Sequence, residues 1–311
     1  MQKAREALTP DALALLQAVA QAGSFASAAR ELGLVPSAVT YRIRQIEDAL
    51  DVLLFDRSSR QARLTDAGIE LLREGGRLLQ EMDAVANRVK RVATGWESQL
   101  TIAVDTVISC STMMELVQTF FGLAPTTRVR LRDESLSGTL EAVTTGGADL
   151  AIGIPVEPGN ALGVQTAVLG ELPFVLCVAP HHPLAAMSDP LSDELLLKHR
   201  AIAVADSVKQ GTAVTFGLLA GQDVLTVPTM AAKLDAQLRG LGVGFVPEPM
   251  ARAHVERGTL VVKQVVRSER IPRMSYAWRT TPPPGRGLQW WLRQLESPAT
   301  RRALLERHAH A

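Results

Sequence analysis

The sequence predicts an α/β protein built from three segments, and three observations support this prediction. Residues 24–65 read as two short helices joined by a tight turn and followed by a basic hairpin. Residues 66–93 contain no proline and carry a heptad repeat of apolar residues. From about residue 97 onward, short apolar strands alternate with helical stretches, a pattern typical of a parallel α/β sheet. A chain of 311 residues is also longer than a usual single domain.

The first segment contains clear signals for the start and end of its helices. Ser24 is a suitable N-cap because its hydroxyl can accept a backbone N–H, and Gly33 is a suitable stop because glycine reaches positive φ at low cost. Pro36 can open the second helix at its first position, where no N–H is needed. Four apolar side chains then recur at helical spacing and predict one buried stripe: Val39, Ile43, Ile46 and Leu50.

The other face of the second helix carries hydroxyl, phenol and guanidinium groups, from Ser37, Thr40, Tyr41 and Arg44. Such groups bind base edges and phosphates, so we expect this helix to enter a groove of DNA. In the hairpin, the arginines Arg57, Arg60 and Arg63 alternate with small polar residues, a pattern suited to phosphates or a minor groove. A solvated basic turn is the alternative interpretation of the hairpin.

Residues from about Thr9 to Gly68 resemble the winged helix-turn-helix of LysR-type transcriptional regulators. The matching residues are Gly23-Ser24-Phe25, Ala28-Ala29, Leu32, Ala38-Val39-Thr40, Ile43, Ile46-Glu47, Leu50, Leu54-Phe55, Arg57, Arg63-Leu64-Thr65 and Ala67-Gly68. The resemblance implies a regulator that binds double-stranded promoter DNA as a homodimer or as a tetramer, and it leaves contact with RNA polymerase open. Pro36-Ser37 and Tyr41-Arg42 depart from the usual family residues. We therefore do not carry the family's expected base contacts over to this sequence.

The second segment carries apolar residues seven apart at Leu71, Leu78, Val85 and Val92, with Gly75, Met82 and Val89 between them. Such a repeat favours a coiled-coil linker that pairs with another helix. The resemblance implies the same role, and we expect the dimer contacts to come from Leu71, Leu78, Met82, Val85 and Val89. The alternative is one amphipathic helix packed on its own domain. The expected domains are residues 1–65, 66–95 and 96–311.

The resemblance further implies that the third segment is a two-lobed effector-binding domain of the periplasmic-binding-protein type, with a second lobe at about residues 166–262. Ligands of α/β sheets bind beyond the carboxyl ends of strands. Five residues at such positions are the expected effector contacts: Ser109, Ser135, Ser207, Thr229 and Met230. By resemblance, Ser109 is the position that meets the effector. Each serine at a helix start could instead be a plain N-cap.

The composition limits the other possibilities. No run of about 18 apolar residues is present, so we expect no membrane span, and the acidic residues near the N-terminus argue against a signal peptide. Two cysteines suit a reducing cytoplasm. The net charge is only +1, so DNA binding requires a local basic patch. We expect that the protein is not an enzyme, that it binds no metal ion, and that it needs no cofactor besides a small-molecule effector. Three alternatives stay open: a redox sensor that uses Cys110 and Cys177, a regulator without an effector, and an enzyme or small-molecule binding protein with an accessory DNA-binding part.

Overall fold

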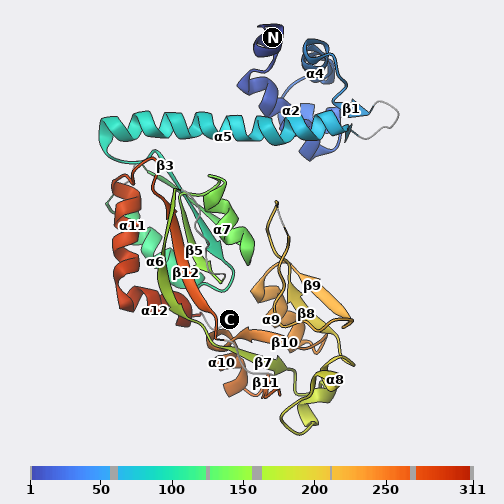
Figure 1. Cartoon of the computed structure of the whole chain (residues 1–311), viewed down its shortest axis with the longest axis vertical. Helices are drawn as coiled ribbons and strands as arrows, with labels where there is room; N and C mark the ends of the chain where they lie inside the picture. Colours follow the sequence, from blue (N-terminus) through green and yellow to red (C-terminus); the bar gives the residue numbers. More distant parts are fainter. Residues whose placement is uncertain are drawn as a thin grey trace. The chain divides into compact units, whose positions relative to one another are not determined.

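The computed structural model describes residues 2–56, 62–123, 127–155, 163–210, 212–266 and 271–308 (Figure 1). The chain divides into two compact units, Met1–Asn87 and Arg88–Ala311. Within the described ranges no single helix is long and apolar enough to span a membrane, and only Pro10–Ala22 with Phe25–Glu31, a pair bent by 116°, reaches that composition together.

The first unit consists of helices α1 to α4, a short hairpin and α5 as far as Asn87. The bounds are α1 Gln2–Ala7, α2 Pro10–Ala22, α3 Phe25–Glu31, α4 Pro36–Leu50, β1 Phe55–Asp56, β2 Arg63–Leu64 and α5 Asp66–Thr94. The expected caps are confirmed, because the Ser24 hydroxyl accepts the N–H of Ser27 and Pro36 opens α4. Gly33 follows α3 with a φ of 65°. The predicted stripe of α4 is also confirmed, since Val39, Ile43 and Ile46 are buried in the core of this unit.

The hairpin is fixed to α4 by a buried carboxylate. Glu47 of α4 accepts hydrogen bonds from the backbone N–H groups of Leu54 (2.8 Å) and Phe55 (3.4 Å). The Phe55 ring also packs edge-on against Phe25 of α3, with 5.1 Å between ring centroids. The two strands pair in register, with Phe55 opposite Leu64 and Asp56 opposite Arg63. The hairpin therefore has a set orientation relative to the helix that precedes it.

The first turns of α5 pack closely on the same unit because glycines stand at the contact points. A Cβ on Gly68 would clash with the carbonyl oxygen of Leu54, and a Cβ on Gly75 would lie 2.9 Å from Leu13 Cδ2 of α2. Leu71 and Leu72 join the apolar core from the same stretch. A larger side chain at either glycine would force the helix away from the core.

The first lobe of the second unit contains a five-stranded sheet in the order β4-β3-β5-β12-β6. Its strands are β3 Gln99–Asp105, β4 Arg128–Glu134, β5 Leu150–Ile154, β6 Val164–Glu171 and β12 Arg273–Arg279. Its helices are α6 Cys110–Phe121, α7 Ser137–Thr144, α11 Arg286–Glu296 and α12 Pro298–Glu306. Helices α6 and α11 cover one face of the sheet and α7 covers the other (Figure 1).

This sheet differs from the expected one in two respects. The sequence predicted a parallel sheet, but β12 pairs antiparallel with both β5 and β6, so the sheet is mixed. The second lobe was expected to start near residue 166, but β6 belongs to the first sheet, so the chain leaves this lobe only after Glu171. Local alternation does not reveal the direction of a strand that is formed by a segment from the far end of the chain.

The second lobe contains the antiparallel sheet β10-β7-β11 and the parallel pair β8-β9. Its elements are β7 Phe174–Val178, a 3₁₀ turn at Pro183–Ala186, α8 Asp193–Leu196, β8 Ala201–Val204, β9 Val224–Val227, α9 Met230–Leu238, β10 Gly244–Pro247, α10 Glu248–Glu256 and β11 Val261–Lys263. The chain enters this lobe between β6 and β7 and returns between β11 and β12. Two connections therefore join the lobes.

Candidate DNA-binding and effector-binding sites

The polar face of α4 is free in the described structure. Ser37, Tyr41 and Arg44 are exposed. Thr40 is half-buried, and its hydroxyl donates to the carbonyl of Pro36 at 3.0 Å within the same helix. Tyr41 accepts a hydrogen bond from Gln45 Nε2 at 3.1 Å, which holds its phenol along the helix surface. This face presents donors and acceptors of the kinds that read base edges in a major groove.

The hairpin contributes one arginine of the predicted wing to the described residues. Arg63 of β2 is exposed and stands opposite Asp56 of β1. Arg57 and Arg60, the other two arginines of the predicted wing, lie outside the described residues. The strand pairing confirms a hairpin at this place, and the roles of all three arginines stay predictions.

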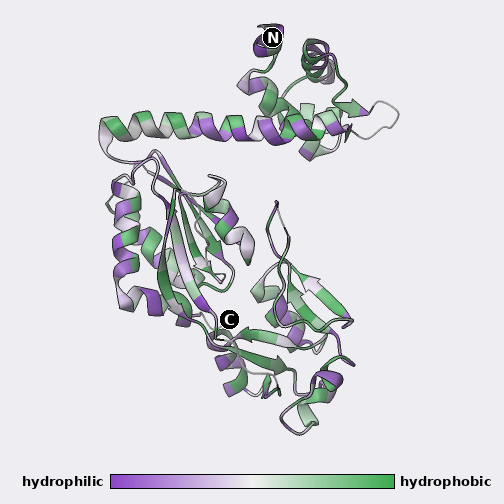
Figure 2. Ribbon diagram, viewed as in Figure 1, coloured by the Kyte–Doolittle hydropathy of each residue, from purple (hydrophilic) through white to green (hydrophobic). Residues whose placement is uncertain are grey.

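The apolar repeat of α5 is divided between two environments. Leu71 is partly buried against the core of the first unit. For this residue the alternative prediction, packing of the helix on its own domain, is the one observed. The later members of the repeat are exposed, with 56% of Leu78 and 64% of Val89 accessible, and Met82 and Val85 are exposed as well. Apolar patches recur along the helix (Figure 2). A continuous row of exposed apolar side chains is the surface that a second helix would cover.

Ser135 and Ser207 lie together where the two lobes meet. The Ser207 hydroxyl donates to Glu134 Oε2 at 2.6 Å and accepts the backbone N–H of Ser135 at 2.9 Å. Ser135 and Glu134 are at the carboxyl end of β4 in the first lobe, whereas Ser207 follows β8 in the second. The structure thus brings together two of the predicted effector contacts that are 72 residues apart.

Asp206 extends the contact between the lobes. Its carboxylate accepts hydrogen bonds from Gly138 N at 3.2 Å and from the hydroxyl of Ser137, both at the start of α7 in the first lobe. It also accepts N–H groups of Val208 and Val214 in its own lobe. Burial acts to raise the pKa of Asp206, but these hydrogen bonds outweigh burial and lower it, so the carboxylate is charged at neutral pH.

Thr106 is a residue that the sequence interpretation did not single out. It follows β3 directly, its Oγ1 lies 3.3 Å from Ser135 Oγ, and it accepts the N–H of Met230 at 3.4 Å. Met230 opens α9 in the second lobe, and Thr229 is the N-cap of that helix, accepting Ala232 N. The position of Thr106 at the carboxyl end of a parallel strand was the signal that could have identified it.

Asp105, the last residue of β3, stabilises this polar contact from within the first lobe. It is buried, and it accepts hydrogen bonds from Val107 N at 3.0 Å, Leu136 N at 2.9 Å and Thr139 Oγ1 at 3.1 Å. Burial raises the pKa of Asp105 to about 7, although these three donors act in the opposite direction. The carboxyl thus fixes the loop that carries Ser135.

Ser109 does not join the group between the lobes. It is fully buried at the start of α6, where it caps the helix by accepting Thr112 N at 3.1 Å. Its hydroxyl donates to the carbonyl of Arg307, and its N–H donates to the carbonyl of Leu304 at 2.8 Å. Within the described residues all its partners belong to α6 or to the C-terminal segment. The structure shows Ser109 in the alternative role of an N-cap whose hydroxyl is covered by the C-terminal segment, and its effector contact stays a prediction.

Metal and thiol chemistry find little support in the described ranges. No group of three or more His, Cys, Asp or Glu side chains is arranged there to hold a metal ion. Cys110 is exposed, whereas Cys177 is buried on β7, and burial raises the pKa of the Cys177 thiol to about 12. A protonated, buried thiol is a poor nucleophile, so Cys177 is unsuited to a two-cysteine redox sensor.

The described elements define a class of protein. A helix-turn-helix unit with an exposed polar recognition helix, followed by a two-lobed α/β domain with polar groups at the lobe contact, is the architecture of a ligand-responsive transcriptional regulator. Residues 10–69 match the family described as "Bacterial regulatory helix-turn-helix protein, lysR family", and residues 93–299 match "LysR substrate binding domain". The chain belongs to the LysR family of DNA-binding transcriptional regulators.

Curated relatives and solved structures agree. The HTH-type transcriptional regulator YhaJ of Escherichia coli O157:H7 is 35% identical over 289 residues, which cover 93% of this chain and 96% of YhaJ. The HTH-type transcriptional regulator YeeY of Escherichia coli K12 is 33% identical over 281 residues, 90% of this chain and 91% of YeeY. The crystal structure of CbnR, a LysR family transcriptional regulator, has the same fold with a TM-score of 0.59 and 18% identity, covering 93% of this chain and 98% of CbnR.

Proposed function

We propose that this regulator binds an operator through α4 and the hairpin, and that a small molecule bound between the two lobes controls its action. Ser37, Thr40, Tyr41 and Arg44 make the contacts to the groove. Arg57, Arg60 and Arg63 of the predicted wing contact phosphates, and no cofactor besides the effector is required. The protein acts in the cytoplasm, where the promoter DNA is.

The observation that carries the effector proposal is the polar contact at Ser207. This hydroxyl crosses from the second lobe to Glu134 and Ser135 of the first. Hydroxyl and carboxylate groups that bind one another across two lobes can exchange these partners for a ligand. A ligand that prefers one arrangement of the lobes then shifts the population toward it. Thr106 and the start of α9 at Thr229-Met230 border the same contact.

The assembly that delivers two recognition helices is a homodimer formed along α5. Leu78, Met82, Val85 and Val89 supply the apolar surface, which is exposed in the single chain. Two copies of α4 held at a fixed separation match two half-sites of an operator. Pairing of two such dimers into a tetramer, and contact with RNA polymerase, would follow from assembly on the promoter.

The effector role is tested with Ser207→Ala and the matched control Ser192→Ala, which removes a hydroxyl that caps α8 in the same lobe. DNase footprints on the protein's own upstream DNA are compared with and without extracts of cellular metabolites. We expect Ser207→Ala to bind DNA normally and to lose the change in footprint, and Ser192→Ala to keep it. An unchanged response in Ser207→Ala would place the effector elsewhere.

A further inference from the structure

The second lobe contains a buried lysine that has no partner among the described residues. Lys233 of α9 is only 5% exposed, and its Nζ forms no hydrogen bond or ion pair with any residue in the described ranges. Burial lowers the pKa of Lys233 to about 8, so the amine is still mainly protonated at neutral pH. Lys263 of the same lobe is also buried, but its Nζ donates to the Met187 carbonyl at 2.6 Å and pairs with Asp189 at 3.0 Å. Lys263 thus has partners for its buried amine, whereas Lys233 has none among the described residues.

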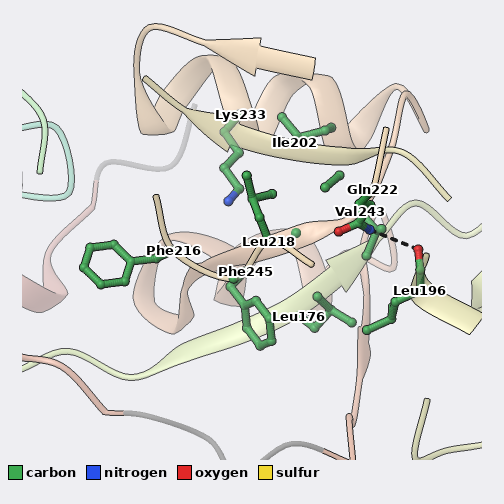
Figure 3. A pocket seen from close by; sticks show the side chains of 12 residues that line it. Leu176, Leu196, Ile202, Phe216, Leu218, Gln222, Lys233, Val243 and Phe245 are labelled. Carbon is green, nitrogen blue, oxygen red and sulfur yellow. Dashed lines mark hydrogen bonds between the residues drawn. The ribbon is translucent and has the colours of Figure 1, made fainter. Parts of the chain in front are cut away.

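The amine of Lys233 faces a small pocket inside the lobe. Apolar side chains make up most of its wall: Leu176, Leu196, Ile202, Phe216, Leu218, Val243 and Phe245. Lys233 extends from α9 into this space, toward Leu218 (Figure 3). The enclosed volume is about 10 Å³. That is room for one water molecule, so a larger occupant enters only when part of the wall moves.

The pocket holds an unbalanced charge in apolar surroundings. A buried cation without a counter-ion is costly, and an anion placed beside it offsets most of that cost. One turn along α9, the Oε1 atom of Gln237 is also buried and has no hydrogen-bond partner in the part of the chain that the structure describes. Both side chains pack against Gly244 of β10, where an added Cβ would lie 2.9 Å from Lys233 Cε and 3.0 Å from Gln237 Nε2. Gln237 is not among the residues that line the pocket, so the ammonium group of Lys233 alone points to a negatively charged ligand.

The wall that covers the pocket belongs to a segment without helix or strand. Phe216 is 54% exposed, and Gly217 has a φ of 77° and lies against the Phe245 ring. The same segment is held at its start by Val214 N, which donates to Asp206 at 2.9 Å. Asp206 is part of the contact between the lobes. The wall of the pocket is therefore connected to the lobe contact through Val214 and Asp206.

We propose that the Lys233 pocket is an anion subsite of the second lobe, where Lys233 pairs with the carboxylate of a small effector that has an apolar carbon skeleton. The aromatic and aliphatic wall accepts the skeleton, and the ammonium group selects the charge. This inference rests on the proposed function, because it names the chemistry of the ligand to which the regulator responds.

Thermal unfolding with paired probes tests the subsite. Acetate and benzoate are compared with acetamide and benzamide, with sodium chloride as the ionic control, on the full-length wild type, Lys233→Met and Lys198→Met. Lys198 is exposed in the same lobe and controls for net charge. We expect a carboxylate to raise the Tm of the wild type and of Lys198→Met by a few degrees, and the amides to leave it unchanged.

Lys233→Met should unfold at a higher temperature than the wild type when no probe is present, because an unpaired buried charge is removed. It should also bind the carboxylate about ten- to a hundredfold more weakly. Equal stabilisation of Lys233→Met and the wild type would overturn the proposal. Should Lys233→Met not fold, equal stabilisation of the wild type by benzoate and benzamide would overturn it as well.

A gel shift with upstream DNA on the same preparations separates this inference from the proposed function. A wild type that shifts its DNA but shows no carboxylate response overturns the subsite alone. A wild type that shows the carboxylate response and binds no DNA contradicts the proposed operator role and supports the subsite.

Discussion

Helices α4 and α5 both carry an apolar repeat, yet the two repeats lie in opposite environments. In α4 the repeat is buried, with Ile43 only 2% exposed, and the polar face remains free. In α5 the repeat is exposed beyond its first turns, with Leu78 56% exposed. The surface that a helix leaves free indicates its partner. The free face of α4 suits a polar groove, and the free face of α5 suits a second apolar helix.

The largest effect is expected from Leu78→Lys, which places a charge in the middle of the α5 repeat. The dimer should dissociate, because pairing would bury an unpaired ammonium group. Operator affinity should then fall by at least about a hundredfold, since two linked half-sites are lost. Sedimentation and gel shifts measure both effects. Gln80→Lys, on the other side of the helix, is the control, and an intact oligomer in Leu78→Lys would show that α5 is not the dimer contact.

The next largest effect concerns stability, and it should differ between a buried residue of the α4 repeat and an exposed residue of the α5 repeat. Ile43→Ala should lower the free energy of unfolding by about 2–5 kcal/mol, because it leaves a cavity in the core of the first unit. This loss should not depend on protein concentration. Leu78→Ala should destabilise the protein in a concentration-dependent manner, since its cost falls on association. Denaturant titrations at two protein concentrations measure the difference. The same concentration dependence in both variants would contradict the different roles of the two repeats.

A smaller effect is expected on the polar face of α4. Arg44→Ala should weaken operator binding by about 1–3 kcal/mol if the guanidinium reads a base, with relaxed preference at one position of the site. Selection from a randomised operator library measures both quantities. The control is Lys198→Ala, which removes a cation from the second unit. Retention of wild-type affinity and preference by Arg44→Ala would contradict the assignment of α4 as the recognition helix.

The smallest effect should come from Arg63→Ala in the hairpin. A phosphate contact carries no sequence information, so binding should weaken almost equally for operator and random DNA. The slope of log affinity against log salt should decrease by about 1, because one fewer counterion is released. Binding isotherms at several salt concentrations measure this slope. An unchanged slope would mean that Arg63 lies in solvent, as a plain basic turn would.

Local signals predicted much of the fold, and contacts between distant segments were harder to predict. Ser24, Pro36 and the α4 stripe act within a few residues of themselves, so the sequence pattern was sufficient. The antiparallel insertion of β12 depends on a segment more than 100 residues after β6, and nothing near Arg273–Arg279 reveals its direction. Glu47 was also not foreseen as a buried anchor, because a glutamate on a helix usually faces water.

The candidate site shows the same difference between local signals and contacts of distant segments. Ser135 and Ser207 were expected to converge because both follow strands, and they do. Ser109 also precedes a helix after a strand, but the carbonyl of Arg307, 198 residues away, covers its hydroxyl. Lys233 drew no attention in the sequence because lysine on a helix is ordinarily solvated. Its burial becomes visible only when Phe216 and Phe245 are placed around it.

Leu136 gives the lobe contact a further property. It has a φ of 57° and a ψ of −124°, a backbone conformation that costs a non-glycine residue about 1–3 kcal/mol. Asp105 holds it there through the Leu136 N–H, and this places Ser135 and Ser137 against the second lobe. The strain at Leu136 is therefore offset within the first lobe, and Ser135 and Ser137 are held in place by contacts of that lobe. A metabolite that replaces the second lobe at these residues therefore meets a preorganised surface, which lowers the entropy cost of its binding.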